Sequence, residues 1–370
     1  MLVTRWIVTA RTLVHIIPAG IFDNSWQGSW KDTVSRIRYF ESRVGDYRQV
    51  RVIDDDLAQC RVAFEACNDV HVLIEYSTFP KIVKWIRQTF PSAFIAVRAH
   101  NIEPLQHLDN HGWRPKRGTL WMLYGMARLM WGDLACKRHA DAIYSISEWE
   151  KKVYWNRMFG AARVEWLPYY CPDHLRPAPS IGFEVRSRIA CLPSSSENRK
   201  SRDLVERFLT FAQRMAQVNG PPNEQSGQAG KSKYECVVTG DLSSWNLAQT
   251  ESARFTGMVE DLSGFLSSCA AVAMLSPLGY GFKTTVEDAI AHGCYVLAHP
   301  ALARRCPSAL AKAIIPVDLD AVAPRSLSNV PVQLTEPFPV PQVDSELRGI
   351  AWRILGGALS RRGSSTTDIR

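Results

Sequence analysis

Short apolar segments alternate with polar or helical stretches along the first half of the chain. Strands are expected at residues 6–10, 49–54, 71–77, 94–99, 141–147 and 164–170. Each of them is rich in Val, Ile or aromatic residues, and the pattern of residues 32–44 predicts a helix. Because such alternation places helices on both faces of a parallel sheet, this half predicts a doubly wound α/β domain.

The same pattern restarts after residues 171–184, which contain three prolines and no apolar period and therefore predict a connector. Strands are expected within 188–196, 234–241, 270–276 and 294–300. The helix expected at 202–218 carries one apolar face, made of Leu204, Phe208, Phe211 and Met215. A second doubly wound domain follows from this repetition.

These boundaries predict an N-terminal domain at 1–174 and a C-terminal domain at 175–343. A helix at 344–360 is expected to pack back on the N-terminal domain, and the polar tail at 361–370 is expected to be disordered. Ligands of doubly wound sheets bind at the carboxyl ends of the strands, so the site is expected in the cleft between the two domains.

Composition indicates a soluble globular protein, with 46% hydrophobic and 22% charged residues and no apolar run of membrane-spanning length. The nine cysteines form no CxxC pair, which favours buried thiols and a cytoplasmic location. The net charge of +8 is uneven, because residues 81–170 hold 14 Lys/Arg against 7 Asp/Glu, together with seven of the 12 tryptophans. This stretch suits an anionic membrane surface, here the inner face of the membrane, unless its tryptophans simply fill the core.

The segment SPLGYGFKTTVEDAIAHGCYVLAHP, residues 276–300, carries the clearest chemistry. Gly279 and Gly281 allow a close backbone approach, and a helix is expected to open at Thr284. A loop that opens a helix presents free N–H groups and the positive end of the helix dipole, which together bind phosphate. Lys283 would add a positive charge. Glu287 would bind a ribose diol or, alternatively, close a capping box with Thr284.

Residues 255–300 resemble the donor-binding half of the "group 1" family of retaining GT-B glycosyltransferases. Residues 139–154, 164–173 and 188–208 are also similar to this family, whereas residues 1–138 resemble it only in architecture. The resemblance implies a fold of two Rossmann-like domains that face a cleft. It also implies a nucleotide and diphosphate site made of Arg199, Lys200, Gly281, Phe282, Lys283, Thr284 and Glu287.

The sequence departs from the family at two places. The family's first donor-sugar glutamate is replaced by Gly279, so sugar contacts are expected from Gly279 and Tyr280. The usual Gly-Arg after the first strand of the C-terminal domain reads Pro193-Ser194. Lys200 best matches the family's catalytic diphosphate-binding lysine, and Arg199 is a rival by one position.

In the N-terminal domain, the resemblance places His100 near the reacting sugar carbon, as a catalytic residue just past a strand end. Asn101 and Glu103 are the expected acceptor contacts. A histidine at such a position is otherwise often structural.

Two other patterns suggest metals. Asp54–Asp56 fits the DxD of metal-dependent GT-A enzymes, but turns at strand ends commonly carry Asp. His107 and His111 of HLDNH lack a clear third ligand, so this segment is expected to be a polar loop. No bound metal is therefore expected.

The predicted function is metal-independent transfer of a sugar from a nucleotide-diphosphate donor to a glycan or lipid-linked acceptor, with retention. A nucleotide-sugar is then a substrate, and neither a cofactor nor a nucleic-acid partner is expected. The alternatives are a GT-B epimerase or phosphorylase and a catalytically inactive GT-B scaffold subunit.

Overall fold

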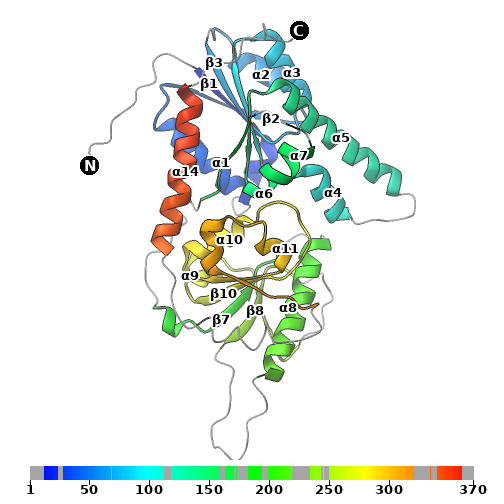
Figure 1. Cartoon of the computed structure of the whole chain (residues 1–370), viewed down its shortest axis with the longest axis vertical. Helices are drawn as coiled ribbons and strands as arrows, with labels where there is room; N and C mark the ends of the chain where they lie inside the picture. The colour runs from blue at the N-terminus through cyan, green and yellow to red at the C-terminus, as the bar shows by residue number, and fades with distance from the viewer. Residues whose placement is uncertain are drawn as a thin grey trace, which may run out of the picture.

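The computed structural model describes residues 12–23, 28–67, 69–111, 118–158, 160, 163–170, 172, 182–193, 199–218, 234–242, 245, 250–320, 334 and 340–360. Within them the chain forms two parallel six-stranded sheets, one above the other in Figure 1. Helices lie on both faces of each sheet, as the alternating pattern predicts.

The first sheet has the order β2-β1-β3-β4-β5-β6. Its strands are β1 (Thr12–Pro18), β2 (Asp46–Val52), β3 (Val70–Glu75), β4 (Phe94–Ala99), β5 (Ala142–Ser145) and β6 (Val164–Trp166). Its helices are α1 (Gly28–Glu41), α2 (Leu57–Ala63), α3 (Pro80–Thr89), α4 (Glu103–His111), α5 (Gly118–His139), α6 (Glu148–Glu150) and α7 (Asn156–Met158), with a π-helix at Lys151–Trp155. We call this part the N-terminal domain.

The second sheet has the order β12-β11-β10-β7-β8-β9. Its strands are β7 (Arg188–Cys191), β8 (Glu235–Thr239), β9 (Arg254–Gly257), β10 (Cys269–Met274), β11 (Tyr295–Ala298) and β12 (Ile314–Pro316). Its helices are α8 (Arg199–Val218), α9 (Leu262–Ser267), α10 (Thr284–Ala291) and α11 (Pro300–Ala303). Three 3₁₀ turns, at Ala19–Asp23, Phe183–Val185 and Ser308–Ala313, complete the described elements of the two domains.

Helix α14 (Val340–Ser360) joins the two cores. Its buried residues Leu347, Ala351, Leu355 and Leu359 belong to one apolar cluster with Leu13 and Phe94 of the first sheet and Val286 of α10. Tyr39 of α1 donates a hydrogen bond to the carbonyl of Trp352 at 3.2 Å. Figure 1 shows α14 running along the side of the N-terminal domain towards α10.

The described structure corrects several expectations. The first described strand, at Thr12–Pro18, was not predicted. Residues 6–10, the loop 220–232, most of the connector and the tail 361–370 lie outside the described residues, so the expectations for them remain predictions. Strands β9 and β12 were not predicted, and residues 107–111 end helix α4 instead of forming a loop. The domain boundaries within the connector remain predictions.

Candidate active site

The loop between β10 and α10 lies against the N-terminal domain through its glycines. Gly279 has a left-handed φ of 91°, and a Cβ atom added there would lie 2.3 Å from Nζ of Lys283. Its amide donates a hydrogen bond to Asp109 of α4 at 2.5 Å. A Cβ atom at Gly281 would lie 1.8 Å from the side-chain oxygen of Asn101. The left-handed φ of Gly279 therefore requires glycine, and the structure brings Gly281 and Asn101 together.

Lys200 and Lys283 line one cavity of about 170 Å³ at the carboxyl ends of β7 and β10. Lys200 belongs to the first turn of α8, and Lys283 immediately precedes α10. Ser201, Ser276 and Thr285 add polar groups to the same cavity. Arg199, the rival of Lys200, is exposed and is not among the described residues that line this cavity.

Both lysines have lowered pKa values. Burial lowers the pKa of Lys200. Burial and then the charge of Lys200 hold the pKa of Lys283 well below its ordinary value. Two lysines and the first turn of α10, through Thr285, thus share one cavity, and lysines beside a helix N-terminus are the groups that bind an anion.

Helix α10 does not use the predicted capping box. The residue at its N-cap is Lys283, with no side-chain cap bond among the described residues, and Thr284 is already the first helical residue. Glu287 is therefore one position too far along the helix for a capping box, and its side chain is fully buried. Its assignment to the nucleotide ribose remains a prediction.

Replacing Glu287 with glutamine is expected to weaken nucleotide binding by about tenfold or more. A hydrogen bond to a charged group contributes about 1.5–3 kcal/mol, and 1.4 kcal/mol corresponds to tenfold. Calorimetric titration with nucleoside diphosphates measures this effect, and Glu206→Gln on the exposed face of α8 is the matched control. A lower melting temperature with an unchanged dissociation constant would assign Glu287 to the fold alone.

The other two predicted loop residues face inwards. Phe282 is buried in the cluster that holds Val286 and Leu302. Tyr280 is partly buried and packs on the N-terminal cluster of Ile102 and Trp155, with the guanidinium of Arg305 6.0 Å from its ring centroid. Arg305, which the sequence analysis missed, also donates a hydrogen bond to the carbonyl of Gly279.

His100 lies just past the end of β4 and is buried. Its Nε2 lies 2.7 Å from Glu75, its Nδ1 lies 3.6 Å from Asp32, and its ring stacks on Tyr76 at 4.3 Å. Burial lowers its pKa, against the opposing effect of Glu75. A buried neutral imidazole held in this way has a structural role in the charge network, and a catalytic role remains a prediction.

Glu103 begins α4 and accepts a hydrogen bond from the side-chain amide of Asn101 at 3.4 Å. Burial raises the pKa of Glu103 to about 7. Lys200 of the opposite domain is among the charges that act on it. The two predicted acceptor residues therefore lie together, close to the lysine-lined cavity.

A buried charge network below these residues escaped the sequence analysis. Arg36 of α1 binds Asp32 at 2.6 Å and Glu75 at 2.7 Å, and Arg98 binds Asp32 at 2.9 Å. All four side chains are almost fully buried. The available signal was the presence of Glu75 and Arg98 inside otherwise apolar strands, because buried charges are nearly always paired.

A second missed feature joins α10 to the N-terminal domain. Asp288 accepts hydrogen bonds from Lys31 of α1 at 2.6 Å and from Tyr169 at 2.7 Å. The helix that follows the glycine loop is thus fixed to the opposite domain by the residue next to Glu287.

The Asp54–Asp56 segment serves the fold through two of its carboxylates. Asp56 caps α2 by accepting from the amide of Ala58 at 2.9 Å. Asp55 accepts from the amides of Lys81 and Ile82 at 2.9 and 3.0 Å, at the start of α3. In HLDNH, the ring of His107 packs against Gly125 and Trp121 of α5, and Asp109 holds Gly279.

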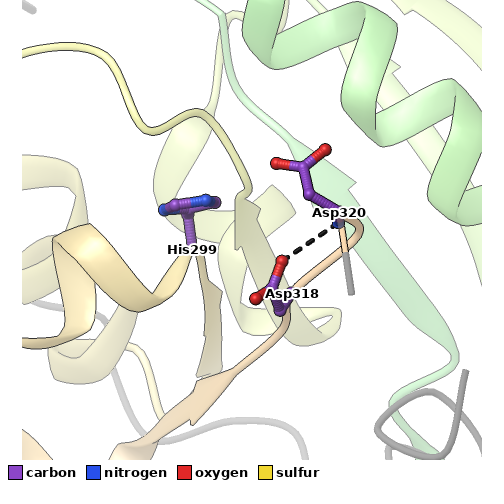
Figure 2. Close-up of side chains that lie close together, drawn as sticks. All are labelled: His299, Asp318 and Asp320. Atoms are coloured by element: carbon purple, nitrogen blue, oxygen red, sulfur yellow. Dashed lines mark hydrogen bonds between the residues drawn. The ribbon is translucent and has the colours of Figure 1, made fainter. Parts of the chain in front are cut away.

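One further group has the composition of a metal site. The potential ligand atoms of His299, Asp318 and Asp320 lie within 4.8 Å of one another, past the ends of β11 and β12 (Figure 2). However, Nδ1 of His299 accepts from the amide of Ala301 at 3.1 Å, so a neutral ring carries its proton on Nε2. Asp318 accepts from the amide of Asp320 at 3.0 Å, and Asp320 binds Arg207 at 3.0 Å. These groups are already committed to a capping network, which does not favour a cation.

Among the described helices, none combines the length and the apolar character needed to cross a bilayer.

Comparison with known proteins identifies the fold. No family model matches the sequence, and no curated protein sequence matches it. Among solved structures, HepE from Anabaena in complex with UDP and glucose is similar at 10% identity with a TM-score of 0.56, over 95% of this chain and 100% of that one.

A trehalose 6-phosphate synthase from Burkholderia multivorans is similar at 11% identity with a TM-score of 0.57, over 95% and 98% of the two chains. A sucrose-phosphate synthase from Thermosynechococcus elongatus is similar at 13% identity with a TM-score of 0.56, over 94% and 100%. The two parallel sheets and these similarities confirm the predicted GT-B fold.

Proposed function

We propose that this protein is a glycosyltransferase that moves a sugar from a nucleoside-diphosphate donor to a glycan or lipid-linked acceptor, with retention of configuration. The observation that carries this proposal is the cavity lined by Lys200 and Lys283 beside the start of α10. The fold adds support, because similar structures include complexes with UDP-glucose and a trehalose-6-phosphate synthase described as transferring with retention.

The physical demand in such a reaction is the negative charge that grows on the leaving diphosphate. Preorganised positive groups stabilise this charge without reorganisation during the reaction. Lys200, Lys283 and the first amides of α10 supply such groups from the C-terminal domain. Asn101, whose side chain lies against Gly281, and Glu103, which accepts a hydrogen bond from Asn101, would orient the acceptor.

A panel of nucleotide-sugars tests this function in two steps. Thermal shifts would identify the donor, because a ligand that binds only the folded state raises the melting temperature. Acceptor-dependent release of the nucleoside diphosphate then separates a transferase from a scaffold subunit, which would bind the donor without releasing nucleotide.

Activity is expected to survive EDTA, because two lysines and a helix N-terminus already supply positive charge to the cavity. Nucleotide release is measured before and after chelation. A metal-dependent enzyme would be supported instead if EDTA abolished nucleotide release, Mn²⁺ restored it, and the variants Asp54→Ala and Asp56→Ala were inactive.

We further propose that the protein is cytoplasmic and docks on the inner face of the membrane through α5. This helix exposes Leu120 (80%), Tyr124 (68%) and Trp131 (66%), all large apolar or aromatic side chains. Its exposed cations are Arg128, Lys137 and Arg138. In Figure 1, α5 extends outwards from the N-terminal domain. Exposed aromatic and basic residues on one helix suit an anionic bilayer surface. Arg114, Lys116 and Arg117, which precede this helix and add to the same basic stretch, lie outside the described residues.

Co-sedimentation with liposomes is expected to show reversible binding that requires anionic lipid and low salt. Each basic residue near such a surface contributes about 1 kcal/mol, so replacing Arg128, Lys137 and Arg138 with Glu should remove about 3 kcal/mol or more. The matched control replaces Arg202, Lys312 and Arg353, which are exposed elsewhere. Negligible binding of the wild type at low salt would favour a soluble acceptor, and equal losses in both variants would place the membrane face elsewhere.

A further inference from the structure

The lysine pair has a property that a simple anion site does not need. Lys200 and Lys283 are two buried cations that line the same cavity. Both side chains cover the same glycine, because a Cβ atom at Gly279 would lie 2.3 Å from Nζ of Lys283 and 3.0 Å from Cδ of Lys200. Two ammonium groups buried this close together repel each other, which favours one neutral amine in the free protein.

The surrounding charges do not offset two ammonium groups. Arg305 adds a third cation at the carbonyl of Gly279. The facing acids are Asp109, which is bound to the amide of Gly279, and Glu103, whose pKa is raised to about 7 by burial. Two positive charges in a buried cavity repel more strongly than in water, because the local dielectric constant is lower. Burial and then this repulsion hold the pKa of Lys283 well below its ordinary value.

We propose that a diphosphate group enters this cavity together with one proton, which the neutral amine of Lys283 takes up. The proton comes from a buffer acid and joins the nitrogen lone pair, and no bond in the ligand breaks. The negative charges of the diphosphate replace the repulsion between the lysines by attraction, so both are ammonium groups in the complex. That the diphosphate belongs to a nucleotide rests on the proposed function, whereas the proton uptake rests on the lysine pair alone.

This coupling gives the site a pH dependence with a definite sign. The complex holds more protons than the free protein, so affinity for diphosphate rises as pH falls. This rise is confined to the pH range between the pKa of Lys283 in the complex and its lower pKa in the free protein. An uncharged nucleoside, which brings no negative charge to the lysines, takes up no proton. The site therefore distinguishes a diphosphate from a nucleoside by charge before any contact with the base or sugar.

Calorimetric titration with UDP in buffers of different ionisation enthalpy tests the proposal. Titration at about pH 8 avoids proton exchange by the ligand, because the second pKa of a phosphate monoester is about 6. The slope of observed enthalpy against buffer ionisation enthalpy is expected to show net proton uptake. Lys200→Met should reduce this slope, because it removes the charge that, after burial, lowers the pKa of Lys283. Arg202→Met, on the exposed side of the same helix, should preserve it. An enthalpy independent of the buffer for the wild type would overturn the proposal.

Two further experiments separate a failure of the proposed proton uptake from a failure of the proposed function or of the variant's folding. If UDP does not bind, inorganic pyrophosphate is titrated into the wild type and into Lys200→Met. The difference in proton uptake between the two proteins removes the contribution of the ligand's own protonation. Greater proton uptake by the wild type than by Lys200→Met would support coupling between the two lysines while contradicting a UDP donor. Pyrophosphate binding with equal proton uptake in both proteins would overturn that coupling. If Lys200→Met does not fold, the ¹⁵Nζ shift of Lys283 in the wild type decides. A shift from amine to ammonium on adding UDP supports the proposal, and an ammonium shift in the free protein contradicts it.

Discussion

Replacing either Lys200 or Lys283 with alanine is expected to lower kcat by about 10²–10³, the loss typical of removing a principal contact to developing negative charge. Both side chains line the cavity at the start of α10, so each would act mainly on the leaving diphosphate. The effect should fall on kcat more than on KM, because the charge grows only as the bond to the sugar breaks. Steady-state nucleotide release measures both constants.

Arg199→Ala is the matched control, because Arg199 is the neighbouring cation on α8 and is exposed. It should change kcat by less than Lys200→Ala does. An inactive Arg199→Ala with an active Lys200→Ala would transfer the role to Arg199. A loss below about tenfold for both lysine variants would remove the pair from the mechanism.

Glu75→Ala is expected to reduce the free energy of unfolding by about 3–5 kcal/mol, the usual cost of removing one partner of a buried ion pair. Glu75 accepts two hydrogen bonds from Arg36 at 2.7 and 2.8 Å, and the Nε2 atoms of His15 and His100 each lie 2.7 Å from it. Its removal would leave Arg36 buried with Asp32 as its one ion-pair partner among the described residues. Urea unfolding measures the loss.

The control Glu41→Ala, at the exposed end of α1, should cost less than about 1 kcal/mol. A similarly small cost for Glu75→Ala would show that the network is hydrated in solution. Because His100 belongs to this network, activity lost in His100→Ala is informative only when the unfolding free energy is measured alongside.

The same network predicts how stability depends on pH. Burial lowers the pKa of His15 and of His100, so below the ordinary histidine value of about 6.5 the unfolded state binds more protons and stability falls. Burial alone would raise the pKa of Glu75, but Arg36, His100 and His15 hold it well below its ordinary value. Its contribution is present above about pH 4.3 and is lost as pH falls through the folded pKa.

The sequence was sufficient for elements whose pattern is local. Strand β4 begins and ends at the predicted residues, Phe94–Ala99, because a short buried run that is apolar apart from Arg98 needs no distant partner to be visible. Strand β1 was not predicted, because the sequence analysis placed the first strand at residues 6–10 and assigned no element to residues 12–18. In the fold His15 is buried against Glu75 and Tyr47, residues that are 60 and 32 positions away, so only tertiary contacts make it a strand residue.

The candidate site was predictable to a similar extent. The glycine loop, the start of α10 and the placement of Lys200 follow from short-range patterns and from the resemblance to GT-B enzymes. The contacts that place these groups were not predictable, because the pair Lys31–Asp288 and the pair Asp109–Gly279 join residues 257 and 170 positions apart. The capping box failed for a local reason, since the helix begins at Thr284 and Lys283 takes the N-cap position.

The most direct test of the account is a proton NMR time course of the donor found by thermal shift, mixed with the protein and a panel of glycan and lipid-linked acceptors. The account predicts that the anomeric signal of the donor falls while a glycosidic signal of the same configuration and an equal amount of nucleoside diphosphate appear, only when acceptor is present and not with Lys283→Ala. A donor that binds but stays intact with every acceptor, or an inverted product, would contradict it.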